Sequence, residues 1–326
     1  MPGPQVTIDR STLSVVPGQR AVDSELQLEI RASRGQQHRL QLPAAAELRS
    51  VTIDGKTQPV RQSGREVVIP VRPGAQTVVL AWREAHQLGW HFETPSVDLG
   101  LASVNHAVSV QMPRDRWSLF LAGPLLGPAV LFWSALLVIG LLAFGLSRTK
   151  LTPLGMLQWT LLGIGLTQVP LSGAVPVVLW LLALGVRERL GAVESPINHN
   201  LLQIVLAFLS LVSLRLLFDA VGQGLLGHPS MQITGNDSSA FQLNWYQDRT
   251  GDIPEQATVI SAPLWVYRAA MLGWALWLAF ALLNWLKWGW SVLSRDGLWR
   301  RLAITPRGWR FRKARDEAES SPPAKE

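Results

Sequence analysis

Five apolar stretches lie between Leu119 and Leu286, and each is separated from the next by charged, proline-rich or polar residues. A hydrocarbon layer of about 30 Å requires about 20 mainly apolar residues per helix, whereas apolar stretches of about 10 to 14 residues are common in soluble cores. The number and length of these stretches predict that residues 117–290 form a polytopic α-helical membrane domain. Its helices are expected at about 119–146, 154–171, 174–186, 201–221 and 263–286.

The second and third stretches are short and are joined by Ser172-Gly173. They are compatible with two helices that cross a thin part of the bilayer, or with a re-entrant hairpin. Either arrangement begins and ends on the same side of the membrane. The choice between them therefore does not alter the predicted topology.

Composition divides the chain near residue 116. Hydrophobic residues make up 48% of the chain and charged residues only 16%, whereas soluble domains carry about 25% charged residues. The deficit of charge lies in the membrane part, and residues 1–116 have an ordinary soluble mixture. The 15 Trp residues, many at the ends of apolar stretches, are interpreted as an aromatic belt at the membrane surface.

The first 116 residues show the periodicity of strands. Leu26, Leu28 and Ile30 alternate with polar residues, as in a strand with one wet face. The dipeptide Asp54-Gly55 suits the type I′ turn of a β-hairpin. These features predict an all-β sandwich of the immunoglobulin-like kind. Further strands are expected at 38–42, 48–53, 67–71, 77–82, 90–92 and 104–110.

Basic residues gather on one side of the predicted helices. Arg148 and Lys150 follow the first stretch, Arg187 and Arg189 follow the third, and the tail 291–326 is basic. Cytoplasmic loops of membrane proteins carry an excess of Lys and Arg. The tail is therefore expected in the cytoplasm.

The same rule places the β domain and a polar external loop, 222–262, on the opposite side. Arg114 and Arg116 argue against this orientation, but the basic tail outweighs them. The opening residues, Met1-Pro2-Gly3-Pro4, do not resemble an export signal. We therefore expect the chain to be the C-terminal part of a longer exported protein. Export by the first membrane helix, or an inverted topology, are the alternatives.

Several segments together resemble a family. These are Leu40 to Pro43, Val51 to Gly55, Val68 to Gly74, and Leu119 to Trp133 with its Gly-Pro-Leu-Leu-Gly-Pro core. The combination is similar to the C-terminal part of large multidomain bacterial envelope proteins, in which β modules precede a polytopic membrane end. The resemblance implies a location in the bacterial inner membrane, with the β domain in the periplasm. It implies no catalytic residues.

Three charged residues within the predicted helices form the candidate intramembrane site. Arg215 and Asp219 are four residues apart and share a helix face, and Arg268 lies near the external end of the fifth helix. Ionisable side chains inside a membrane are costly and are usually paired or face water. The three residues are interpreted as a lock between two helices that reaches the headgroups, with ligand gating or ion coupling as alternatives.

Other chemistry has weak support in the sequence. His86, His91, Glu93 and His106 lie near one another, but their spacing matches no zinc site and is more typical of scattered surface histidines. The chain contains no Cys, which excludes disulfides and thiolate metal sites. Motifs for metalloproteases, serine hydrolases and phosphate loops are missing from the sequence. We therefore expect neither an enzyme nor a cofactor.

The tail combines aromatic and basic residues. Such a segment is typical of binding to the anionic inner leaflet, with nucleic-acid binding as the less favoured interpretation. Asp316 to Glu326 is expected to be disordered. The candidate lipid-binding residues are Arg300, Arg301, Arg307, Arg310, Arg312 and Lys313.

Two functions of different classes remain at this point. In the first, the helices anchor a scaffold whose β domain docks an envelope protein through Trp82, Trp90 or a sheet edge. In the second, the chain is a subunit of a transporter or channel that uses the charged residues of the candidate intramembrane site. The scaffold is preferred because five helices with few polar residues and no visible repeat make a poor transport pathway.

Overall fold

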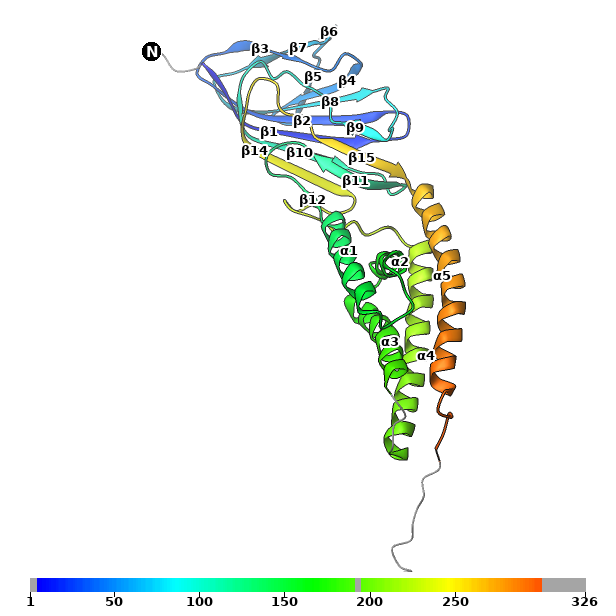
Figure 1. Cartoon of the computed structure of the whole chain (residues 1–326). Helices are drawn as coiled ribbons and strands as arrows, with labels where there is room; N and C mark the ends of the chain where they lie inside the picture. Colours follow the sequence, from blue (N-terminus) through cyan, green and yellow to red (C-terminus); the bar gives the residue numbers. More distant parts are fainter. Residues whose placement is uncertain (1–4, 191–194, 301–326) are drawn as a thin grey trace, which may run out of the picture.

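The computed structural model describes residues 5–190 and 195–300, as a region of β-sheets followed by five α-helices in those ranges. The sheets gather at one end of the molecule and the helices extend away from them (Figure 1). The predicted order, a β-rich region and then apolar helices, is confirmed. The immunoglobulin-like topology stays a prediction.

The largest sheet has seven strands in the order β14-β10-β1-β2-β8-β4-β5. Strands β1 and β10 run parallel, and the other neighbouring pairs are antiparallel. Leu26, Leu28 and Ile30 of β2 are buried as their alternation predicts. The strands are β1 (Val6–Pro17), β2 (Val22–Ala32), β4 (Ala46–Ile53), β5 (Lys56–Gln58), β8 (Gly74–Glu84), β10 (Ser103–Gln111) and β14 (Gln242–Thr250).

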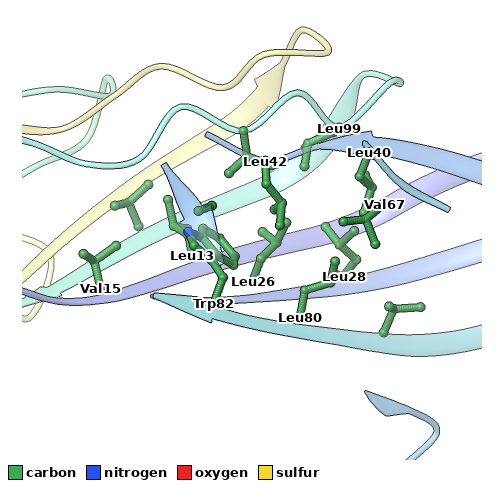
Figure 2. Close-up of a cluster of buried hydrophobic side chains, with 14 of the residues drawn as sticks. Leu13, Val15, Leu26, Leu28, Leu40, Leu42, Val67, Leu80, Trp82 and Leu99 are labelled. Carbon is green, nitrogen blue, oxygen red and sulfur yellow. The ribbon is translucent and has the colours of Figure 1, made fainter. Parts of the chain in front are cut away.

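A smaller sheet packs its apolar side chains against the large one. It consists of β3 (Gln36–Gln41), β7 (Glu66–Val71) and β6 (Gln62–Ser63), with β7 in the middle. Leu40 and Val67 of this sheet share a core with Leu28 of the large sheet (Figure 2). This core excludes water between the two sheets and is the main source of stability in the β region.

The β4–β5 hairpin turns at Asp54 and Gly55, as predicted. Both residues have positive φ, 47° and 75°, and Ile53 pairs with Lys56 across the turn. A type I′ turn requires positive φ at both central residues, which Gly adopts without a steric penalty and Asp tolerates.

The expectation of a loop at 222–262 is wrong, because α4 continues to Leu226 and much of the rest forms strands of the β region, whereas its external side stays a prediction. Strand β14 is the edge of the seven-stranded sheet beside β10. Strand β15 (Thr258–Pro263) lies between β11 (Arg116–Ala122) and β9 (His91–Glu93) in a further three-stranded sheet. The segment is mostly polar, but Leu243, Trp245 and Val259 are buried. Polar residues dilute these apolar positions, so the sequence did not distinguish strands from a loop.

The start of the first predicted helix is also wrong. Residues from Leu119 to Ala122 belong to β11, and β12 (Ala129–Val130) pairs with β13 (Ile233–Thr234) before a helix begins at Phe132. The apolar run continues through both structures, but Pro124 and Pro128 interrupt any helix in this part of it. The predicted membrane helix was therefore too long at its N-terminal end.

Three of the five helices in the described ranges are long and apolar enough to cross a membrane. These are α1, α4 and α5, whereas α2 is a shorter apolar helix. All five helices match predicted apolar stretches, but five membrane crossings are not established. The helices are α1 (Phe132–Thr149), α2 (Met156–Leu166), α3 (Leu171–Arg189), α4 (Pro196–Leu226) and α5 (Leu264–Ser294).

The two ends of the helical region differ in chemistry. At one end, β12 leads into α1, α4 leads toward β13, and β15 leads into α5 (Figure 1). At the other end, the guanidinium of Arg189 donates to the backbone oxygen of Thr149 at 2.8 Å, so the ends of α3 and α1 meet there. The basic connectors thus lie away from the β region.

Several Trp residues bind helices together rather than forming a surface belt. Trp180 donates its indole N–H to Oγ of Ser210, and Trp274 donates to the backbone oxygen of Leu161, both at 2.8 Å. Both indoles are buried between helices. Exposed residues such as Trp265 remain compatible with the predicted belt. Burial of an aromatic ring with its N–H paired gives specific packing between helices.

We expect Gly165→Ala to destabilise the helical region, because a Cβ at Gly165 would overlap the indole ring of Trp274. Displacing this ring should cost about 2 kcal/mol and lower the melting temperature of the purified protein in detergent. Gly140→Ala on α1 is the control, since its Cβ would meet open space. Equal melting temperatures for the two variants would contradict this packing.

Candidate functional site

Arg215 and Asp219 form an ion pair on α4, with 3.1 Å between Nη2 of Arg215 and Oδ1 of Asp219. The Arg215 side chain is 70% exposed and the Asp219 side chain 35% exposed. The guanidinium also lies 6.0 Å from the ring centre of Phe218. The predicted pairing of these two residues is therefore present, on an outward face of the helix.

Arg268 does not join this pair. It is exposed on α5 and forms no ion pair within the described ranges. Gly224 of α4 packs against the side chain of Met271, which sets the register of the two helices. Asp219 lies five residues from Gly224 toward the basic end, and Arg268 lies three residues from Met271 toward the β region. The expected lock among the three residues is wrong because this register separates them in depth.

The two tryptophans proposed for docking lie in different environments. Trp82 is 1% exposed in the core of the β region (Figure 2), and its Nε1 donates to Oε1 of Glu84 at 2.9 Å. Docking through Trp82 is therefore wrong, because its ring fills the core on the inner face of β8. Trp90 is 56% exposed and remains a candidate. Alternation along a strand could not tell which face of β8 is covered.

We expect Trp82→Ala to reduce the stability of the β region by about 3 to 5 kcal/mol, since truncating a buried Trp leaves a cavity. Trp90→Ala is the matched control and should change stability by less than about 0.5 kcal/mol. Urea unfolding followed by circular dichroism measures both effects. Similar midpoints for the two variants would contradict the burial of Trp82.

The four residues considered for zinc do not come together as a site. No group of three or more potential His, Asp or Glu ligands lies together within the described ranges. His91 and Glu93 approach to 3.6 Å at the surface. His106 is instead buried, and its Nδ1 lies 2.7 Å from Oγ of Ser11. The same Ser11 hydroxyl lies 2.8 Å from Oγ of Ser103.

Burial lowers the pKa of His106 to about 4 from its usual 6.5. Its Nε2 is buried without a partner within the described residues, so protonation would bury an uncompensated charge. Burial also lowers the pKa of His38, partly opposed by its bond to the backbone oxygen of Leu99. Both histidines therefore favour the neutral form in the folded protein.

We expect the β region to lose stability as the pH falls from about 6.5 to about 4. The unfolded chain takes up a proton near pH 6.5, whereas folded His106 does so only near pH 4. The loss should approach about 3 kcal/mol, at about 1.4 kcal/mol per pKa unit. Thermal melting across this pH range should be less pH-dependent for His106→Gln than for the wild type. Identical pH dependence would contradict a neutral, buried His106.

The junction between the β region and the helices contains a polar cluster that the sequence did not reveal. The guanidinium of Arg116 on β11 donates to Oγ of Ser261 at 3.0 Å and to the backbone oxygen of Gly89. Burial lowers the pKa of Arg116. Next to it, Trp117 packs edge-on against Tyr267 of α5, with 5.3 Å between ring centres. Arg116 thus joins β11, β15 and the segment before β9 at the membrane end of the β region.

A second polar cluster closes the opposite end of the helices. Arg187 of α3 pairs with Asp296 after α5 at 2.7 Å. Asn200 of α4 donates to the backbone oxygen of Arg300 and accepts from its N–H, at 2.8 and 3.0 Å. These bonds position the start of the basic tail. The other tail candidates, Arg301, Arg307, Arg310, Arg312 and Lys313, lie outside the described residues, and lipid binding by the tail stays a prediction.

A polar groove of about 390 Å³ runs beside β3. On one side Gln41 exchanges backbone hydrogen bonds with Asp98, and Arg39 pairs with Glu66 at 3.2 Å. Strand β3 is the edge of its sheet. Because backbone groups alternate along a strand, Gln37 and Arg39 direct theirs to the same side as Gln41, away from β7. The backbone oxygen of Arg39 lies against Gly100 on this side, so the edge is open at Gln37. The groove is lined by Gln36, His38, Arg39, Gln41, Glu66, Asp98, Gly100 and Leu101.

No protein-family model and no curated protein matches the chain. Similar solved structures include an M1 zinc metallopeptidase from Deinococcus radiodurans, with a TM-score of 0.29 and 12% identity over 38% of this chain and 35% of that chain. A mutant of the same peptidase has a TM-score of 0.29 and 13% identity, again over 38% and 35%. This chain thus covers little more than a third of the peptidase, and scores this low carry no argument about fold or function.

Proposed function

We propose that the protein is an integral membrane scaffold that holds its β region at the membrane surface and presents it to an envelope protein, with no catalytic role. One observation carries this proposal: the segment between membrane helices α4 and α5 supplies β14 and β15 to the sheets. The β region is therefore built partly from the membrane domain. A scaffold needs a rigid connection of this kind, whereas a tethered binding module does not.

The connections at the junction are short and hydrogen-bonded. Strand β15 ends at Pro263 and α5 begins at the next residue, whose N–H donates to the backbone oxygen of Asp115 at 2.8 Å. Leu126, before α1, exchanges backbone hydrogen bonds with Tyr246 of β14 at 2.7 and 3.1 Å. Motion of the β region relative to α1 and α5 would break these bonds. This geometry supports a fixed orientation of the β region on the membrane.

The proposal includes a location in the bacterial inner membrane, with an immunoglobulin-like β region in the periplasm and the basic end in the cytoplasm. Arg148, Lys150, Arg187 and Arg189 at the end away from the sheets support this orientation by the positive-inside rule. All five helices are proposed to be embedded in the membrane, with α2 and α3 as a pair that enters and returns.

The groove beside β3 is the proposed docking site on the β region. An extended segment of a partner can add to a sheet edge through backbone hydrogen bonds, while pockets beside the edge read its side chains. Within the described residues Gln37 offers unpaired backbone groups on this edge, and Arg39, Glu66 and Asp98 offer charges of both signs. These features favour a polar, extended peptide segment.

Gln37→Pro tests this docking site, because it removes an N–H on the open edge of β3 without removing a bond to β7. Thr57→Pro on the open edge of β5 is the matched control. We expect an envelope protein that binds the wild type and Thr57→Pro in nanodiscs to bind Gln37→Pro at least about tenfold more weakly, a loss of about 1.4 kcal/mol. The melting temperatures of all three proteins should agree. Equal retention by Gln37→Pro, or no bound protein at all, would argue against the proposal.

A further inference from the structure

Arg215 lies near the middle of a long membrane helix. Helix α4 has 31 residues from Pro196 to Leu226, so its central residue is Leu211. Arg215 is four residues from this centre, or about 6 Å at about 1.5 Å per residue. The hydrocarbon layer extends about 15 Å to either side of its midplane. The backbone of Arg215 therefore lies inside the hydrocarbon when α4 is centred in the bilayer.

The Arg215 side chain points away from the other helices of the chain. The opposite face of α4, with Leu206, Ser213 and Leu217, is buried against the helical region. Arg215 instead belongs to an exposed stripe in which residues follow one another at intervals of three and four. The stripe consists of Leu201, Ile204, Phe208, Leu211, Arg215 and Phe218.

The Arg215–Asp219 ion pair leaves hydrogen-bond donors of Arg215 and an acceptor of Asp219 unused. A guanidinium has five N–H donors and a carboxylate has two acceptor oxygens. The ion pair joins one Arg215 nitrogen to Oδ1 of Asp219, and no further acceptor for Arg215 or donor to Oδ2 of Asp219 lies within the described residues. In hydrocarbon, unused charge-bearing groups are costly. The face therefore requires an occupant that supplies both a donor and an acceptor.

We propose that α4 packs against α4 of a second copy of this chain, with Arg215 of each copy donating to Asp219 of the other. Two copies in one bilayer have the same orientation, so their α4 helices run parallel and their charged pairs lie at the same depth. A two-fold axis brings the same patch of each copy together. Each copy then supplies the donor and the acceptor that the other lacks, and the four charges sum to zero.

An occupant with a single charge satisfies only half of this requirement. A lipid phosphate accepts from Arg215 but repels Asp219, and a lone acidic residue on a different membrane protein has the same defect. The intervals of three and four along the stripe form the seam of a left-handed helix pair. Gly222 continues the stripe after Phe218 and allows the two backbones to approach. A second copy is thus the occupant that the charges and spacing favour.

Cysteine cross-linking tests the contact directly, because the full-length chain contains no Cys. In native membranes treated with a mild oxidant, Leu211→Cys should form a disulfide-linked dimer. Phe280→Cys on α5 is the matched control, since both side chains are 69% exposed, and it should stay monomeric. No dimer from Leu211→Cys, or a cross-link only to a protein of different mass, would overturn the proposal.

Charge exchange between copies identifies the pairing. In the Leu211→Cys background, Arg215→Asp carries two negative charges on this face and Asp219→Arg carries two positive charges. Each variant produced alone should lose at least about nine tenths of its cross-linking, corresponding to about 1.4 kcal/mol of lost association. The two variants produced together, with different tags, should recover the cross-link between unlike copies. Recovery also shows that both variants insert and fold. If either variant alone cross-links as much as the protein with Arg215 and Asp219 intact, or if the mixture shows no recovery, the proposed contacts between Arg215 of one copy and Asp219 of the other are overturned.

Discussion

The structure depends on two sheets that are completed by strands from the segment between helices α4 and α5. Without β14 and β15, strand β10 would be an exposed edge and β11 would have no neighbour in its sheet. Unpaired strand edges invite association with other chains and leave backbone groups unsatisfied. The segment between α4 and α5 supplies β14 and β15 to these positions. Backbone hydrogen bonding thus couples the β region to the helices more firmly than a covalent linker alone.

Several polar side chains within the helical region find hydrogen-bond partners on neighbouring helices or segments, although Nε1 of Trp159 and Nδ1 of His199 are buried without one within the described residues. Trp180 finds Ser210, Trp274 finds the backbone oxygen of Leu161, and Asn200 pairs with both backbone groups of Arg300. Such bonds are favoured where no water is available. Arg215 and Asp219 differ from these residues because their unused donors and acceptor lie on the outer face of α4. This contrast distinguishes a contact within one copy of the chain from a surface that requires a second copy.

The incorrect site predictions share one cause. The spacing of residues along the sequence does not show which residues of other helices or strands lie beside them. Arg215 and Asp219 pair because a separation of four is a local property of any helix. Arg268 does not join them because the register of α4 on α5, set where Gly224 meets Met271, separates them in depth. Trp82 is buried because β8 turns that face toward the smaller sheet. The junction at Arg116 joins residues more than 140 positions apart, Ser261 among them, and no local pattern contains it.

Local chemistry in the sequence was sufficient for several strands of the first half, the turn at Asp54 and Gly55 and the existence of five helices, because periodicity and turn geometry depend on near neighbours. Strand β1 (Val6–Pro17) was not predicted. The division between a β-rich region and apolar helices follows from composition. Tertiary structure alone decided that Leu119 lies within a strand of a sheet, that the polar segment after α4 completes two sheets, and that β3 leaves part of its edge open. These features depend on which strand lies beside which, and that choice is made by hydrogen bonding and packing between residues far apart in the chain.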